Sequence, residues 1–279
     1  MKWNIVADSS CDLKTKDVKC EGDMGFSTVP FTINVGDKLF VDDEELDTEK
    51  LVFEMENCSK ASGSACPSPL MWAEEFKKAV FSVAITISGN LSGSLNSALT
   101  GMEMALSENK DKKVIVLDSK STGPEIALCI HKIVEWIKNG EVIESINEKA
   151  QKFLQETKTA FALCSFDNLV KNGRMSRIAG FLAKTLGMWG IGIASDEGTI
   201  VIKGKSRGES KALAFLLQDM KERGFKGGQV AISHCHNENM AQKLKDAIIG
   251  CWENACVTIL NTRGLDSFYA ERKGLIIAF

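Results

Sequence analysis

Three short apolar segments, each leading into a polar loop, constrain the fold of this chain most strongly. They are WNIVAD (residues 3–8), SVAITI (82–87) and KVIVLD (113–118). Continuous runs of Val, Ile and Leu are typical of strands that are buried on both faces. Residues 95–106 and 124–140, which follow the second and third segments, carry their apolar side chains at helical spacing. This alternation predicts an α/β fold with a doubly wound parallel sheet.

The pattern changes after about residue 158. Residues 190–208 predict two strands joined by a turn at 196–198, and a helix is predicted from about Glu209. A chain of 279 residues is also near the length at which one core divides into two. We therefore predict two domains, an α/β domain at residues 1–158 and a mixed α+β domain at residues 159–279.

Composition excludes several classes of protein. The chain has 34 Lys and Arg against 37 Asp and Glu, without a basic stripe interleaved with aromatics, so nucleic acid is not an expected partner. No apolar run approaches the roughly 18 residues that span a bilayer, and the amino end turns polar too early for a signal peptide. The nine cysteines include no CxxC pair, which favours reduced core residues over a disulfide framework or a zinc site. We expect a cytoplasmic protein.

Polar segments follow the three predicted parallel strands, at residues 7–12, 88–94 and 117–123. Ligands of open α/β sheets collect at the carboxyl ends of the strands. Two of the segments lead into helices, whose first backbone N–H groups attract anions. The loop SGNLSGS at 88–94 is therefore a candidate anion-binding loop, although Ser and Gly also cap helices without binding any ligand.

Known catalytic motifs do not match this loop. A phosphate-binding Walker loop needs a lysine that residues 89–94 lack, and neither Ser92 nor Ser94 has the flanking glycines of a nucleophile elbow. The three histidines fit structural roles better than catalytic ones, although HCH at 234–236 could bind a metal weakly. We predict no catalytic residues and no metal site.

One enzymatic alternative remains open at the same sheet edge. Asp8, Asp12 and Asp118 all lie at predicted strand ends and could gather as a magnesium site or a general base. Capping of neighbouring loops is the commoner use of such residues. A small-molecule enzyme built on these carboxylates would show metal-dependent turnover.

Seven segments, taken in order along essentially the whole chain, resemble the DegV family. That family comprises bacterial fatty-acid-binding proteins that present acyl chains to a fatty-acid kinase. The segments are IVADSSCDL at the amino end, VPFTINVGDKLFVDD (29–43), SGSACPSP (62–69), ISGNLSGSLNSA (87–98), VLDSKSTG (116–123), LVKNGRMSR (169–177) and KSRGESKAL (205–213).

The resemblance implies a function and its partners. It implies a two-domain DegV-like fold, also called the EDD fold, and a non-enzymatic carrier that serves phospholipid metabolism. The ligand would be a long-chain fatty acid of about 16 to 18 carbons held in a tunnel, with no further cofactor. The implied partners are a separate fatty-acid kinase, which forms the acyl phosphate, and transiently a membrane surface. A divergent relative that acts only as an interaction module is the remaining alternative.

The resemblance also assigns residues. Hydroxyls that bind the ligand carboxylate in the family correspond to Ser64 and to Ser92, which Gly93 and Ser94 follow. The family's Gly-Gly-Arg turn corresponds to residues 172–174, so Arg174 is the implied charge partner of the head group. An exposed Arg without this role is equally compatible with the sequence.

The carboxyl end departs from the family pattern Gly-Thr-His-x-Gly-Pro-Gly. Aligned without gaps, Tyr269 takes the place of the His, and Glu271, Arg272 and Lys273 replace Gly-Pro-Gly. A phenol can donate the same hydrogen bond as the His, so Tyr269 joins the expected binding residues. For the tunnel lining we expect residues 161–169 and 178–193, which are rich in apolar side chains and could equally be ordinary core.

Overall fold

The computed structural model describes residues 1–175 and 187–279. Its first part is a parallel four-stranded sheet in the order β2-β1-β6-β7. The strands are β1 (Trp3–Asp8), β2 (Met24–Val29), β6 (Phe81–Thr86) and β7 (Lys113–Asp118). The three predicted strands are thus confirmed, and β2 adds an edge strand that was not predicted.

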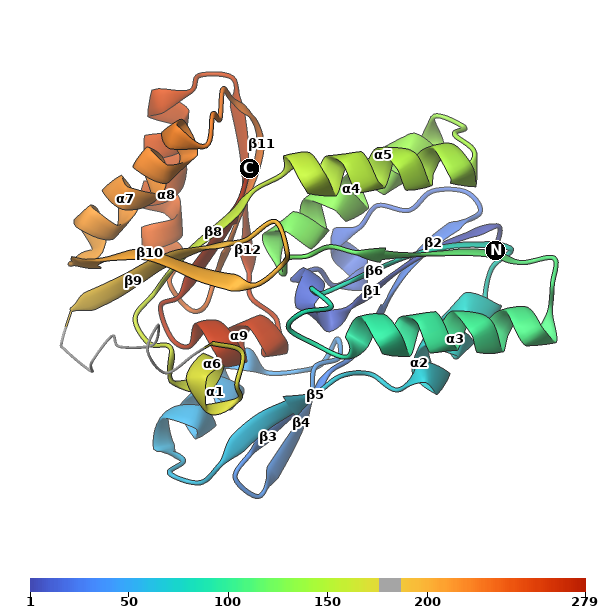
Figure 1. Ribbon diagram of the computed structural model, residues 1–279, viewed down its shortest axis with the longest axis horizontal. Helices are drawn as coiled ribbons and strands as arrows, with labels where there is room; N and C mark the ends of the chain where they lie inside the picture. The colour runs from blue at the N-terminus through green and yellow to red at the C-terminus, as the bar shows by residue number, and fades with distance from the viewer. Residues whose placement is uncertain (176–186) are drawn as a thin grey trace.

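Helices cover both faces of this sheet, as the doubly wound prediction requires (Figure 1). One face packs against α2 (Pro69–Lys77) and α3 (Ser94–Glu108), and the other against α4 (Pro124–Lys138) and α5 (Ile143–Glu156). Pro124 is the first residue of α4, where its missing N–H costs no helical hydrogen bond. Of the stripe predicted for α3, Ala98 and Ala105 are buried, whereas Leu99 is exposed.

The second large sheet is mixed and has the order β10-β9-β8-β13-β11-β12, in which only β11 and β12 are parallel neighbours. Its strands are β8 (Thr159–Leu163), β9 (Met188–Ala194), β10 (Ile200–Arg207), β11 (Gly228–His234), β12 (Ala255–Asn261) and β13 (Leu275–Ala278). The predicted hairpin is confirmed, because β9 and β10 pair as antiparallel neighbours. The predicted helix at Glu209 is α7 (Glu209–Glu222), which packs with α8 (Glu238–Cys251) on one face of this sheet.

The opposite face of the mixed sheet carries two short helices, α6 (Asp167–Lys171) and α9 (Gly264–Ala270). A small antiparallel sheet, β4-β3-β5, lies beside α9 together with α1 (Thr48–Asn57). Its strands are β3 (Thr32–Val35), β4 (Lys38–Val41) and β5 (Ser62–Ala65), and two 3-10 turns, Ser9–Cys11 and Thr15–Asp17, follow β1.

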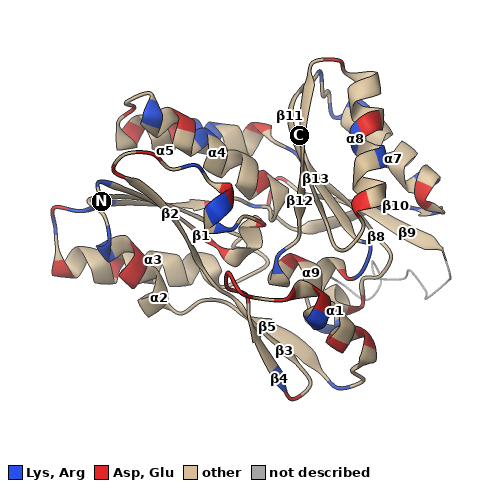
Figure 2. Cartoon of the chain, turned by 180° about the vertical axis from the view of Figure 1, so that it is seen from behind, with Lys and Arg blue, Asp and Glu red and all other residues tan. Residues whose placement is uncertain are grey.

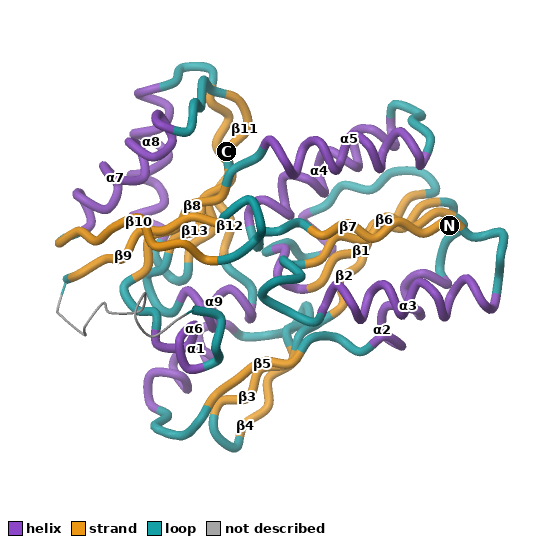
Figure 3. The backbone as a smooth tube through the Cα atoms, viewed as in Figure 1, coloured by secondary structure: helices purple, strands orange, loops and turns teal. Residues whose placement is uncertain are grey.

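Helix α4 connects the two large sheets. Its Leu128 packs against Ala231 of β11 and Ala278 of β13, while its other face belongs to the core of the parallel sheet. The loops that follow β6 and β7 consequently lie between the sheets (Figure 3). The domain boundary between residues 158 and 159 stays a prediction, although the first strand of the mixed sheet begins at Thr159.

Charged residues of both signs lie on the outer helices and in the loops, whereas most strand positions are uncharged (Figure 2). In the part of the chain that the structure describes, no helix is both long enough and apolar enough to cross a membrane.

Candidate functional site: an apolar cavity with hydroxyls at one end

The loop at residues 88–94 forms a tight turn between β6 and α3. The backbone N–H groups of Leu91 and Ser92 donate to the Ser88 carbonyl at 3.0 and 3.1 Å. Ser88 N in turn donates to the Ser121 carbonyl at 2.9 Å, which joins this loop to the one after β7. The two polar strand ends that the sequence singled out are therefore hydrogen-bonded to each other.

Asp8, at the end of β1, binds both ends of this loop through hydrogen bonds. Its carboxylate accepts hydrogen bonds from Ile87 N at 3.0 Å, Ser94 Oγ at 2.6 Å and the Ser10 hydroxyl. Burial raises the pKa of Asp8, and these hydrogen bonds oppose the shift by stabilising the carboxylate. Asp8 is thus a buried structural acceptor that fixes the start of α3.

A cavity opens where the loops after β6 and β7 face β8, β10 and α9. Its empty space, counted together with the solvent in its open mouth, is about 810 Å³. Most of the surface that lines it is apolar, and the lining residues come from the loops after β6 and β7, from the mixed sheet, from α6 and α9, and from Ser64 of the small sheet. The apolar lining residues include Phe31, Ile87, Leu91, Phe161, Leu163, Leu169, Ile200, Leu265 and Ile276.

Ser64, Ser92 and Tyr269 supply hydroxyl groups at one end of this cavity. Ser64 Oγ, on the edge strand β5, lies 2.9 Å from the hydroxyl of Tyr269 on α9, and both residues line the cavity. One of the two hydroxyls donates to the other, which leaves the second proton to be donated to a ligand. Ser92 Oγ accepts from Ser94 N at 3.2 Å, so its own proton is also available as a donor.

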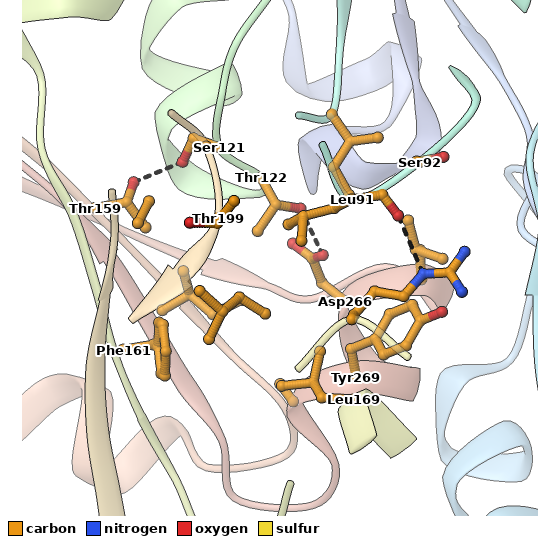
Figure 4. A pocket seen from close by; sticks show the side chains of 18 of the residues that line it. Leu91, Ser92, Ser121, Thr122, Thr159, Phe161, Leu169, Thr199, Asp266 and Tyr269 are labelled. Atoms are coloured by element: carbon orange, nitrogen blue, oxygen red, sulfur yellow. Dashed lines mark hydrogen bonds between the residues drawn. The ribbon is translucent and has the colours of Figure 1, made fainter. Parts of the chain in front are cut away.

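Arg174 brings a positive charge to the same end. Its Nε donates to the Leu91 carbonyl at 3.0 Å, and one Nη group donates to the Asn172 carbonyl. A guanidinium has five N–H groups, so these bonds leave others for a ligand. Figure 4 shows Ser92 and Tyr269 on one side of the cavity and Ser121, Thr159 and Phe161 on the other. The first side thus combines hydroxyl donors with a cation, a set suited to a carboxylate.

The tip of the β9–β10 hairpin covers part of the cavity. Ser88 Oγ donates to the Gly198 carbonyl at 2.7 Å, and Asn90 Nδ2 donates to the Glu197 carbonyl. A side chain at Gly198 would meet Ser88 Oγ and approach Lys120 Cα to 2.8 Å, and its φ of +77° also favours glycine. Close contact between hairpin and loops therefore requires a glycine at this position.

A pair of acidic residues borders the cavity wall. Asp12 Oδ2 and Asp266 Oδ2 are buried and have no hydrogen-bond partner among the residues that the structure describes. Burial raises the pKa of Asp12 to about 7, and burial together with the neighbouring Asp12 raises the pKa of Asp266 well above its usual range. A proton held between the two carboxyl groups would give each oxygen a partner and reduce the charge beside an apolar cavity.

Each of the three acidic residues considered at the sheet edge accepts hydrogen bonds from backbone N–H groups. Asp12 Oδ1 accepts from Arg263 N at 2.7 Å, and Asp118 Oδ1 accepts from Gly89 N and Lys120 N at 3.1 and 3.0 Å. Asp8 is equally engaged in the loop described above. Within residues 1–175 and 187–279, no group of three or more His, Cys, Asp or Glu side chains is placed to hold a metal ion.

Comparison with known proteins identifies the family. A family model described as "Uncharacterised protein, DegV family" matches residues 2–264. The chain belongs to the DegV family. A DegV domain-containing protein of Streptococcus pneumoniae is 37% identical over 279 residues, which are 100% of this chain and 99% of that protein.

Solved structures of DegV proteins share the fold over its whole length. The Streptococcus pneumoniae Fatty Acid Kinase (Fak) B3 protein, loaded with linoleic acid, has a TM-score of 0.96 and 36% identity, with 100% of this chain and 99% of that chain covered. A DegV family protein from Eubacterium eligens, loaded with heptadecanoic acid, has a TM-score of 0.94 and 35% identity, with 99% and 98% covered. Both of these similar proteins hold a fatty acid.

Four of the six predicted binding residues line the cavity: Ser64, Ser92, Arg174 and Tyr269. Gly93 is the N-cap of α3, and Ser94 is buried with its hydroxyl bonded to Asp8. The part of all six residues in ligand binding stays a prediction.

Part of the predicted tunnel lining lies on the cavity wall. Phe161, Leu163 and Leu169 line the cavity, but Trp189 and Ile191 face the core beneath α7 and α8. Alternate residues of a strand point to opposite faces, so an apolar run such as 188–193 does not reveal which face meets a cavity. Residues 178–186 of the predicted lining lie outside the described residues. The lining residues Leu265, Asp266 and Ile276 were missed because they lie near the carboxyl end, where we expected only Tyr269 to contribute.

Proposed function

We propose that this DegV protein binds one long-chain fatty acid, with its carboxylate at Ser64 and Ser92 and its acyl chain in the apolar cavity. One observation carries the proposal: a mostly apolar cavity gathers the hydroxyls of Ser64, Ser92 and Tyr269 and the Arg174 guanidinium at one end. A ligand that complements it has one anionic head and a long apolar tail. The fatty acids held by similar DegV structures have this shape.

The acyl chain and the carboxylate of the ligand contribute differently to binding. Burying about 14 methylene groups at about 0.8 kcal/mol each gives a gross gain near 11 kcal/mol. A neutral hydrogen bond contributes roughly 1 kcal/mol net. The tail therefore supplies most of the affinity, while the Ser64 and Ser92 hydroxyls fix which end of the ligand reaches the mouth.

The head-group site suits presentation of the carboxylate to another protein. Hydroxyl donors stabilise the carboxylate without forming a covalent bond, and Asp8 Oδ2, Asp12 Oδ1 and Asp118 Oδ1 already accept hydrogen bonds from backbone N–H groups. We therefore propose that this chain is a carrier and that a separate fatty-acid kinase transfers a phosphoryl group to the bound carboxylate. The name of the similar Fatty Acid Kinase (Fak) B3 protein supports this assignment.

Both proposed domains contribute to binding. Residues 1–158 supply Ser64 and Ser92, whereas residues 159–279 supply Phe161, Ile200 and other walls of the cavity. We place the protein in the cytoplasm. Because long acyl chains partition into lipid bilayers, ligand exchange would involve transient contact with a membrane surface.

Native mass spectrometry of the protein purified from a bacterial host, followed by organic extraction, tests the proposal. We expect one long-chain fatty acid per chain. A protein that is empty and refuses added oleic acid would contradict the proposal and favour the interaction module. Metal-dependent turnover of a small molecule by the same preparation would favour the enzyme.

A further inference from the structure

The turn that follows α9 has an unusual backbone. Glu271 has φ 55° and ψ 176°, and Lys273 has φ 74°. The conformation of Glu271 is one that glycine adopts freely and that other residues adopt only with strain. Both residues stand where the DegV pattern described above has glycine. The chain thus carries side chains at two turn positions whose backbone conformation favours glycine.

The Glu271 side chain makes contacts that a glycine could not provide. Ser165 Oγ donates to Glu271 Oε1 at 2.9 Å, and Asn168 N donates to the same oxygen at 3.3 Å. These two donors flank the start of α6, so Glu271 binds that helix from more than 100 positions away. A second connection runs the other way, because Asn168 Nδ2 donates to the Phe268 carbonyl of α9 at 2.9 Å.

Both elements joined in this way carry a residue of the head-group site. Tyr269 lies on α9, two residues before Glu271. Arg174 follows α6 after the two residues Asn172 and Gly173, and its backbone N–H donates to the Leu169 carbonyl at 2.8 Å, so its position depends on that of the helix. The positions of Arg174 and Tyr269 therefore depend on how α6 and α9 lie relative to each other.

We propose that Glu271 is a positioning residue, which fastens the start of α6 to the end of α9 and thereby holds Arg174 and Tyr269 in place around the ligand carboxylate. The inference rests on the proposed function for its effect on affinity. Burial of the Glu271 side chain raises its pKa, and the donation by Ser165 opposes that shift. The contacts thus favour an ionised acceptor at this point.

The decisive variant is Glu271→Gly, which relieves the backbone strain and removes the carboxylate together. We expect its melting temperature to stay within about 3 °C of the wild-type value, because strain relief offsets the lost contacts. We expect its affinity for oleic acid to fall roughly tenfold. Glu271→Gln keeps an acceptor oxygen and should retain the wild-type affinity. Lys273→Gly relieves strain at the neighbouring position without touching α6, and it should also bind normally.

Tyr269 is the single tyrosine of the chain, so its NMR resonance reports the position of its ring independently of ligand affinity. With ¹³C-labelled tyrosine, the Tyr269 resonance of the ligand-free protein should shift or broaden in Glu271→Gly and stay unchanged in Glu271→Gln and Lys273→Gly. Ser165→Ala should give a smaller change in the same direction, and it serves as the test if Glu271→Gly does not fold.

Wild-type affinity and an unchanged Tyr269 resonance in Glu271→Gly would overturn the proposal, as would equal losses in Glu271→Gln and Glu271→Gly. Failure of the wild-type protein to bind oleic acid would instead contradict the proposed function, and the resonance would still report on the role of Glu271.

Discussion

Tyr269 offers the most direct single-residue test of the head-group site, because its hydroxyl lies 2.9 Å from Ser64 Oγ. Tyr269→Phe removes that hydroxyl and keeps the ring that packs edge-on against Phe268. We expect the affinity for oleic acid to fall roughly tenfold, as loss of a hydrogen bond with a partly buried partner predicts. Isothermal titration calorimetry of the delipidated wild-type and variant proteins measures this affinity. Equal affinities would show that the phenol has no part in binding.

Glu125 should make stability depend on pH. Burial raises its pKa to about 7 in the folded protein, while Thr159 Oγ1 donates to it at 2.6 Å and opposes the rise. Between about pH 4.5 and 7, the folded chain therefore holds a proton that the unfolded chain releases. The free energy of unfolding should fall as pH rises through this range, by roughly 3 kcal/mol at most from this group.

Glu125→Gln tests this account, because the amide stays neutral and can still accept from Thr159. Urea unfolding at pH 5 and pH 7.5 should show a smaller loss of stability for the variant than for the wild type. The same loss in both proteins would mean that Glu125 ionises normally in the folded chain.

Individual residues differ in how far the sequence predicted them. Ser64 and Ser92 were assigned through the DegV motifs, and both line the cavity. Asp8 was considered as a metal ligand or base, but it serves as a buried acceptor for the loop at 88–94. A carboxylate at a strand end has the same sequence context in either role, and only its hydrogen-bond partners distinguish them.

Among the elements, the β9–β10 hairpin is held to the cavity loops at Gly198. Gly198→Ala would combine an unfavourable positive φ with a clash against Ser88 Oγ and Lys120 Cα. Gly224→Ala is the matched control, because Gly224 has φ +82° and nothing within 4 Å of the added Cβ. We expect the control to lose about 1 kcal/mol of stability and Gly198→Ala about 2 kcal/mol more. Equal losses, measured by urea unfolding, would show that the hairpin is not seated on these loops.

Continuous apolar runs made β1, β6 and β7 predictable, since strands buried on both faces need no alternation. Other strands carry weaker indications. Strand β2 reads MGFSTV, with a glycine and two hydroxyl residues, and β13 has only four residues after a charged turn. The three strands of the small sheet have four residues each, which is too short for periodicity to indicate them.

The site as a whole exists only in the folded molecule. Ser64 and Tyr269 are 205 positions apart, and the cavity wall draws on the small sheet, the mixed sheet and the loops that follow β6 and β7. The periodicity of a short segment indicates whether a residue lies in a strand or a helix. It does not indicate which distant residues that residue will face. Resemblance to the DegV family predicted this grouping, whereas periodicity alone predicted only the sheet edge.

Ligand binding should stabilise the whole molecule. A ligand that binds only the folded state at 100 times its Kd adds about 2.7 kcal/mol to the free energy of unfolding. For the delipidated protein this predicts a rise in melting temperature of roughly 5 to 10 °C with oleic acid. Octanoic acid at the same concentration should give a much smaller rise, because it buries about half as many methylene groups. Equal rises would contradict a long apolar site.

The Ser64→Ala/Ser92→Ala double variant tests the central claim most directly, when its occupancy by oleic acid is measured by native mass spectrometry. Ser62→Ala/Ser107→Ala, which alters two serines outside the cavity lining, is the control. We predict one bound oleic acid per chain in the wild type and in the control, and a large loss of occupancy in the double variant at limiting ligand. Occupancy equal to that of the wild type would contradict the assignment of the carboxylate to these two hydroxyls.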